Sequence, residues 1–390
     1  MGSLHHTAKR NSIPEGWRNL KLGSVFSLSS GNSKPENTIS ILTDENVIPV
    51  YGGNGVLGYT DKCQDVGEQL VIGRVGINCG NIYYINGPYW ITDNALYARE
   101  WKTEVIIKYI CYHLSYLDLG KLKSKTGQPL VSQKPIYDLP ISLPPICEQK
   151  KVSQILSTWD RAIERVQRLI EAKQRQKAKL VSQLLSGRMR FPGFQDEWKQ
   201  VRLGTFLHPK FRKVVKPAGA YLRLGIRSHG KGTFTSVVDD PETIALTHLF
   251  QTHIDDLIVN ITFAWEGAIA LVGPDGDGAL VSHRFPTYVF DISKMLPEYF
   301  KHLMVTDRFF YELDLISPGG AGRNRVMNKG DFLKITVAVP DIEEQKKIAG
   351  VLGGMDEQIA LLNKYLEKLK VQKKGLMQKL LTGEIRVKVD

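Results

Sequence analysis

Lysine, arginine, asparagine and glutamine gather in two glycine-containing loops of this 390-residue sequence, at residues 121–128 and 319–329. Arginine and lysine can bond the edge of guanine, and asparagine or glutamine can form two hydrogen bonds with adenine. These residue types therefore make both loops candidate DNA contacts, although each loop alone is equally compatible with an ordinary solvated turn. With one further arginine between two glycines, the candidates are Arg74, Lys121, Lys123, Lys125, Gln128, Arg323, Asn324, Arg325 and Lys329.

Motifs for catalysis are matched only in part. Residues 225–232, GIRSHGKG, approach a phosphate-binding loop, but Gly232 stands where the motif requires a hydroxyl for magnesium, and the TFTSVV that follows is β-branched. Asp341 and Glu344 are too close in sequence to surround a metal from separate strands, as nuclease carboxylates do. HExxH and Asn-Pro-Pro-Tyr motifs do not occur in the sequence. We therefore assign no catalytic or metal-binding residue.

A stretch of 51 residues occurs twice. Residues 141–191 and 337–387 align without a gap at an offset of 196 positions, and 17 of the 51 are identical. A repeat of about half the chain is too long for a solenoid and indicates a duplicated half-molecule. The start of each globular segment repeats as well, because Trp17 matches Trp198 and Leu22 matches Leu203.

Each copy of the repeat predicts a long helix. Apolar residues step by four and three positions over five heptads, which is the spacing of a coiled-coil seam. About 40 residues at about 1.5 Å each give a rod of roughly 60 Å. A single seam also fits an ordinary core helix, but its recurrence at one offset favours two helices that pair. We assign seam residues as partner-binding, namely Leu156, Trp159, Ile163, Leu352, Met355 and Ile359.

The two globular segments combine predicted strands with a predicted helix, which indicates an α+β fold. Turn glycines and β-branched residues predict strands, and apolar residues three and four apart predict one helix at 104–117 and one at 297–316. A long run at 253–272 is predicted to be extended. The predicted domains are 1–145 and 191–340 for the globular segments, and 146–190 and 341–390 for the helices.

Composition adds weaker constraints. The net charge of +12 suggests a polyanionic partner. The four cysteines are scattered, which favours reduced thiols in the cytoplasm, and no apolar run reaches 18 residues, so we expect no membrane span.

The boundaries of the repeat resemble those of a known family. The strings LPPICEQKKVSQIL and VPDIEEQKKIAGVL begin the helices, and KLVSQLLSGRMRF and LMQKLLTGEIRV end them. This pattern, present twice and covering almost the whole chain, resembles the specificity subunit of type I restriction–modification enzymes. One difference concerns the second globular segment, where TFAWEG replaces the glycine–arginine turn of the first.

The resemblance implies two target-recognition domains that each recognise half of a split site in double-stranded DNA. It implies a pseudo-twofold arrangement in which the helices pair as an antiparallel coiled coil and dock two methylation subunits. Restriction–translocase subunits join for cleavage. S-adenosylmethionine, ATP and magnesium are then expected on the partner subunits, and this chain binds no cofactor and catalyses no reaction.

Two alternatives stay open at this stage. A coiled-coil assembly protein would hold its partners without recognising a DNA sequence. A nucleotide-driven enzyme would use the loop at 225–231, and it would lose nucleotide binding when Lys231 is replaced by alanine.

Overall fold

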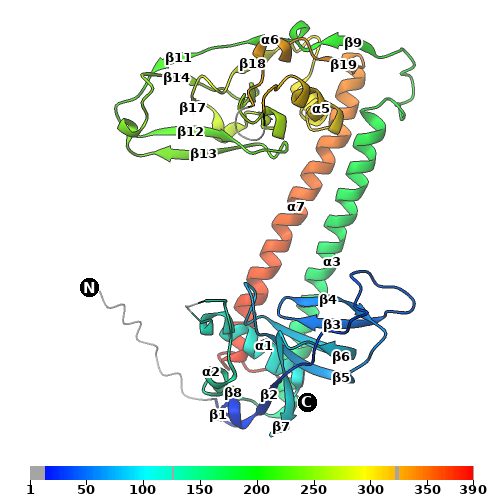
Figure 1. Ribbon diagram of the computed structural model, residues 1–390, viewed down its shortest axis with the longest axis vertical. Helices are drawn as coiled ribbons and strands as arrows, with labels where there is room; N and C mark the ends of the chain where they lie inside the picture. The colour runs from blue at the N-terminus through cyan, green and yellow to red at the C-terminus, as the bar shows by residue number, and fades with distance from the viewer. Residues whose placement is uncertain (1–13, 125–126, 321–324, 390) are drawn as a thin grey trace. The chain divides into compact units, whose positions relative to one another are not determined.

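The computed structural model describes residues 14–124, 127–320 and 325–389 (Figure 1). The chain forms two compact units, of which the first contains the residues up to Arg168 and those from Lys364 onward, and the second contains Leu169–Asn363. Both long helices, α3 (Ile146–Leu184) and α7 (Ile342–Leu381), contribute to both units. Each unit therefore combines one globular segment with the start of one long helix and the end of the other, which confirms the predicted fold class.

A six-stranded sheet organises the first unit, with the strand order β2-β7-β5-β6-β3-β4. The central strand β5 buries three successive residues, Leu70, Val71 and Ile72, because both faces of the sheet are covered at this point. The elements are β1 (Arg18–Lys21), η1 (Leu22–Ser24), β2 (Phe26–Ser30), β3 (Ile48–Gly52), β4 (Gly55–Thr60), β5 (Asp65–Gly73), β6 (Ile82–Ile91), β7 (Ala95–Trp101), α1 (Ile107–Leu117), η2 (Leu119–Leu122), α2 (Gln133–Tyr137) and β8 (Pro140–Leu143).

Two larger sheets organise the second unit, with the orders β10-β18-β15-β16 and β11-β14-β17-β12-β13. Residues 227–232 connect two strands of the second sheet, so the near-match to a phosphate-binding loop is a hairpin turn followed by a strand. The elements are β9 (Lys199–Arg202), η3 (Leu203–Thr205), β10 (Leu207–Pro209), β11 (Lys213–Val215), β12 (Tyr221–Ile226), β13 (Thr233–Val238), η4 (Pro241–Thr243), β14 (His248–Gln251), β15 (Leu257–Val259), η5 (Ala264–Glu266), β16 (Ile269–Leu271), η6 (Pro274–Gly276), β17 (Leu280–Val281), β18 (Thr287–Phe290), α4 (Pro297–Leu303), α5 (Asp307–Leu315), α6 (Lys329–Phe332) and β19 (Thr336–Val339).

Two sequence predictions for the second unit are wrong. Residues 297–316 form the two helices α4 and α5 instead of one, because Thr306 adopts an extended conformation and its hydroxyl accepts a hydrogen bond from the Phe309 N–H. Threonine is a favoured N-cap, and this start signal was hidden by the continuous apolar spacing. The run at 253–272 is interrupted by the 3-10 turn η5, which separates β15 from β16.

The repeated residues hold an equivalent framework in each unit. Strand β1 pairs with β8 and strand β9 pairs with β19, in both cases antiparallel and over four residues. The buried side chains of Gln149 and Gln345 accept hydrogen bonds from Ile106 N–H and Leu296 N–H, both at 3.0 Å. Each glutamine thereby fixes the start of a shorter helix, α1 or α4, to the start of a long helix.

Ion pairs repeat at the same offset of 196. Lys373 pairs with Asp160 at 2.5 Å in the first unit, and Lys177 pairs with Asp356 in the second. Since each pair joins the early part of one long helix to the late part of the other, the helices run antiparallel within each unit. Nearer the helix starts, Arg386 pairs with Glu148 and Arg190 pairs with Glu344.

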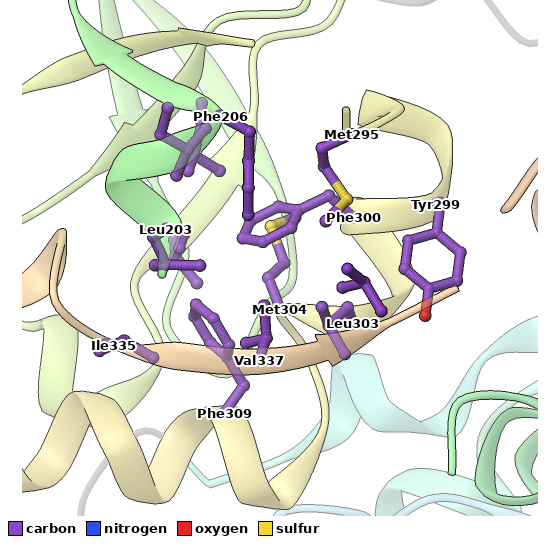
Figure 2. Packing of buried hydrophobic residues seen from close by; sticks show 14 of the residues in the cluster. Leu203, Phe206, Met295, Tyr299, Phe300, Leu303, Met304, Phe309, Ile335 and Val337 are labelled. Atoms are coloured by element: carbon purple, nitrogen blue, oxygen red, sulfur yellow. The ribbon is translucent and has the colours of Figure 1, made fainter. Parts of the chain in front are cut away.

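One apolar core per unit includes both long helices. In the second unit Phe206, Phe300 and Phe309 pack edge to face, with centroids 5.8 and 5.6 Å apart, beside Val337 of β19 (Figure 2). Leu352 of α7 lies in the same core. The first unit has an equivalent core that contains Leu156 of α3 together with Leu380 and Leu381 of α7. Within the described residues, no helix is both long and apolar enough to cross a bilayer.

Candidate nucleic-acid interface

In the first unit the structure brings Arg74 together with the loop at 121–130. Val75 forms a β-bridge with Leu130, and the backbone of Arg74 accepts a hydrogen bond from Val131 N–H at 2.9 Å. Lys123 donates its ammonium to the Ile77 carbonyl at 2.6 Å, so that lysine also holds the two loops together. Two segments about 50 residues apart in sequence therefore form one surface.

The guanidinium of Arg74 is held at the edge of this surface. Its Nη1 donates to the Ser30 hydroxyl at 2.8 Å, and its backbone N–H donates to the Asn94 carbonyl at 3.0 Å. Arginine has five N–H donors, and the bond to Ser30 employs one of them. Arg74 is half-buried, and the bond to Ser30 orients its guanidinium while leaving other donors available.

Two asparagines that were missed in the sequence lie beside Arg74. Gly53 packs so closely that an added Cβ would lie 2.4 Å from the Val75 carbonyl oxygen and 3.2 Å from that of Asn94. The next residue, Asn54, is exposed at the β3–β4 turn, and Asn94 is exposed before β7. Both carry the amide that suits an adenine edge. In the sequence they were indistinguishable from ordinary turn residues, and only the close approach of glycine to backbone places them here.

The remaining candidates of the first unit differ in their surroundings. Lys121 is exposed and lies 3.6 Å from Asp118 in a surface ion pair of the kind that contributes little stability. Gln128 is exposed, and Ile77 at the tip of the neighbouring loop is 84% exposed, which is unusual for an isoleucine. Lys125 lies outside the described residues.

The second unit holds the same backbone framework. Ile261 N–H donates to the Arg284 carbonyl at 3.0 Å, and the Ile261 carbonyl accepts from Met327 N–H at 2.8 Å. These bonds match those of Arg74 with Asn94 and Val131 in the first unit, and Val131 and Met327 are also related by the repeat offset. The turn at 261–267 therefore takes the place of the glycine–arginine turn, with isoleucine at the position of Arg74.

Arg325 is engaged within the fold. Its guanidinium donates to the carbonyl groups of Ser317 and Asp314 at 2.9 Å each, pairs with the Asp314 carboxylate at 2.7 Å, and stacks 5.1 Å over the Trp265 ring. A base contact would have to break these bonds, so Arg325 serves to attach the loop to α5. Lys329 is exposed and donates to the His283 carbonyl at 3.2 Å. Arg323 and Asn324 lie outside the described residues.

The helix residues assigned to partner binding divide into two groups. Leu156 and Leu352 have no exposed surface, and Met355 is also buried, because the seam faces the apolar cores of the two units. Assigning these three to a partner surface was therefore wrong. Trp159, Ile163 and Ile359 are partly exposed.

A groove lies beside each repeated ion pair. The groove of the first unit has a volume of about 970 Å³ and includes Asp160, Lys373 and Tyr112, whose hydroxyl donates to Asp160. The groove of the second unit has a volume of about 740 Å³ and includes Lys177 and Asp356. His302 lies 3.9 Å from Asp356, in the place corresponding to Tyr112 of the first unit. Burial, reinforced by the charge of Lys301, lowers the pKa of His302 to about 4.

Two α+β domains with polar loop surfaces, each attached to a pair of helices, define a protein that presents two recognition surfaces. The model of the type I restriction modification DNA specificity domain matches residues 14–174 and 197–371, and the chain belongs to this family. The predicted resemblance is therefore confirmed, and the chain functions in DNA-sequence recognition within restriction–modification systems.

Two specificity subunits and one solved structure are similar to this chain over 96% of its length. The type I restriction enzyme MjaVIII specificity subunit of Methanocaldococcus jannaschii is 23% identical, with 96% of this chain and 94% of the relative covered. A provisionally named specificity subunit of the same organism, MjaX, is 27% identical over 96% of this chain and 95% of its own length. The fold is similar to that of the crystal structure of a type I restriction–modification S subunit from M. genitalium, with a TM-score of 0.63 at 16% identity and coverage of 96% and 98%.

Proposed function

We propose that each unit recognises one half of a bipartite site in double-stranded DNA. The observation that carries this proposal is the shared backbone framework, in which Arg74 and Ile261 occupy equivalent positions but present different side chains. Two surfaces of one shape with different hydrogen-bonding groups would select two different short sequences. Base-edge contacts would supply the specificity, and exposed lysines such as Lys121 and Lys329 would add a salt-dependent attraction to phosphate.

Two methylation subunits would dock on the paired helices, one at each groove. The support for this number is the repetition of the ion pair and groove in the two units. Partly exposed helix residues, Trp159 and Ile163 in one unit and Ile359 in the other, would contribute apolar contacts. Restriction–translocase subunits would join this assembly to cleave DNA.

The chain itself would act as a non-catalytic subunit in the cytoplasm. Its partial matches to nucleotide-binding and nuclease motifs fall in a hairpin turn and at the start of α7. S-adenosylmethionine, ATP and magnesium would bind to the partner subunits.

Mapping of methylated adenines tests the proposal. The chain is expressed with its neighbouring methylation subunit in a host without other adenine methylases, and modified adenines are located genome-wide. Two short specified blocks separated by an unspecified gap are the expected result. A stable complex that leaves no sequence-specific methylation would favour the coiled-coil assembly protein instead.

A further inference from the structure

The two units present arginine from different positions of the same framework. In the first, Arg74 donates its backbone N–H to the Asn94 carbonyl, and in the second, Ile261 donates to the Arg284 carbonyl. The position that carries an arginine in the first unit thus carries an isoleucine in the second, and the position of Asn94 carries an arginine. In the first unit the guanidinium belongs to the residue that donates this backbone hydrogen bond, and in the second it belongs to the residue that accepts it.

The backbone around Arg284 is fixed by several hydrogen bonds. The N–H of Arg284 donates to the Ser282 hydroxyl at 3.3 Å, and Phe285 N–H donates to the Ser282 carbonyl at 3.0 Å, which closes a turn. Lys329 is bonded to the carbonyl of the preceding residue, His283. A fixed Cα is what a base-contacting side chain requires, because small displacements weaken a two-bond contact.

The side chain of Arg284 is accessible in this fixed setting. It is exposed, and its Nη1 approaches the Thr262 hydroxyl at 3.5 Å, which is a long hydrogen bond. Two other arginines of the unit are more strongly engaged. Arg325 is bonded to Asp314 and Ser317, and Arg227 donates to the Thr233 carbonyl and stacks over Phe234 at 5.0 Å.

We propose that Arg284 is a specificity-determining residue of the second unit and contacts a guanine through its O6 and N7 atoms. The proposal rests on the proposed function, in which this unit recognises half of a bipartite site. The guanidinium is the side chain best matched to these two acceptors in the major groove. Thr262 contacts the guanidinium and would position it, and Lys329, which is bonded to the preceding residue, would bind a neighbouring phosphate.

The test compares methylation motifs of the assembled complex with and without the guanidinium. Complexes carrying wild-type chain or Arg284→Ala are checked for assembly and mapped for methylated adenines, followed by affinity measurements on duplexes. We expect Arg284→Ala to lose the requirement for one G·C pair in one block and to keep the other block unchanged. Affinity for the original site should fall by about 5- to 150-fold, with little loss on a duplex in which that pair is already replaced.

Two further variants and the wild-type complex make the outcome decisive. Arg202→Ala removes an exposed arginine of β9 in the same unit and should leave the motif unchanged. If Arg284→Ala fails to assemble, Arg284→Gln retains a polar side chain and is tested in the same way. An unchanged motif, or equal weakening on specific and unrelated duplexes, overturns the role of Arg284. Absence of a bipartite motif from the wild-type complex instead overturns the proposed function.

Discussion

The two units share an interior framework and differ in the sheets that this framework supports. Gln149 and Gln345 make the same buried hydrogen bonds, and Asp160 and Asp356 pair with equivalent lysines. Yet the first unit carries one sheet of six strands and the second carries sheets of four and five strands. Buried polar groups must keep their partners, whereas sheet order can change provided that the apolar core stays filled.

The same contrast exists at smaller scale in the recognition loops. Backbone hydrogen bonds fix the shape around Arg74 and around Ile261, and any residue except proline can supply such bonds. Side chains at these positions can therefore be exchanged without loss of the loop geometry. Under the proposed function, a framework that tolerates exchange in this way would allow the two halves to recognise unrelated sequences.

The largest effect is expected from breaking a buried ion pair of the framework. Arg190→Ala removes the partner of Glu344, which is 1% exposed, and leaves a buried carboxylate with Trp198 Nε1–H as a remaining donor. The expected loss is about 3–5 kcal/mol of the unfolding free energy, measured by urea denaturation of the full chain.

The equivalent change in the first unit sharpens this comparison. The Arg386 side chain is 40% exposed and that of Arg190 is 23% exposed, so Arg386→Ala should destabilise less. Lys334→Ala, which removes an exposed pair with Asp331, is the matched surface control and should cost less than about 1 kcal/mol. A loss from Arg190→Ala no larger than that of Lys334→Ala would show that the framework pair has no special importance.

Core positions of the long helices come next. Leu352→Ala in the second unit and Leu156→Ala in the first each empty a fully buried site, and each should cost about 2–5 kcal/mol in denaturation experiments. Leu361→Ala, at a residue of α7 that is 66% exposed, is the control and should be within about 0.5 kcal/mol of wild type. Similar losses at all three positions would contradict the placement of the seam in the two cores.

The framework could be predicted from the sequence because its residues occur twice at one offset. The heptad spacing predicted the two long helices. Gly187 and Gly383 follow their last turns, both in the left-handed conformation that glycine adopts easily. The break at Thr306 could not be predicted in this way, because apolar residues continue with helical spacing across it. An N-cap within a periodic run is a local signal, and a prediction based on apolar periodicity overlooks it.

The recognition surface was only partly predictable. Composition singled out the loop at 121–128 as a candidate, but it could not distinguish a base contact from an arginine that binds its own fold, as Arg325 does. Asn94 and Arg284 gave no signal, because their equivalence exists only in backbone hydrogen bonds between distant segments. Such contacts depend on the tertiary fold and have no local pattern.

A pH effect should distinguish the two grooves. Burial lowers the pKa of His302 from 6.5, the value of an ordinary histidine, to about 4 in the folded chain, and the charges of Lys301 and Lys177 lower it further while that of Asp356 opposes the change. The unfolded chain therefore binds a proton first as the pH falls, and stability present above pH 6.5 is lost between pH 6.5 and 4. His302→Gln should remove up to about 3 kcal/mol of this pH dependence in denaturation curves recorded across that range.

The counterpart of His302 in the first unit is Tyr112, and burial raises the pKa of its hydroxyl away from this range. Tyr112→Phe should therefore leave the slope of stability against pH between 6.5 and 4 unchanged. An equal effect of the Tyr112 and His302 substitutions on that slope would contradict the assigned difference between the grooves.

The smallest effect is expected at the recognition surface of the first unit, and it completes the comparison with Arg284. Arg74→Ala should weaken binding of the assembled complex to its site by about 1–3 kcal/mol and relax one position of one block in the methylation motif. Because the two arginines belong to different units, this block should be the one that Arg284→Ala leaves intact. Arg99→Ala, which removes an exposed arginine from β7, serves as the control for lost charge. If Arg74→Ala and Arg284→Ala relaxed the same block, the two units would recognise one continuous sequence, and the division of the site between them would have to be abandoned.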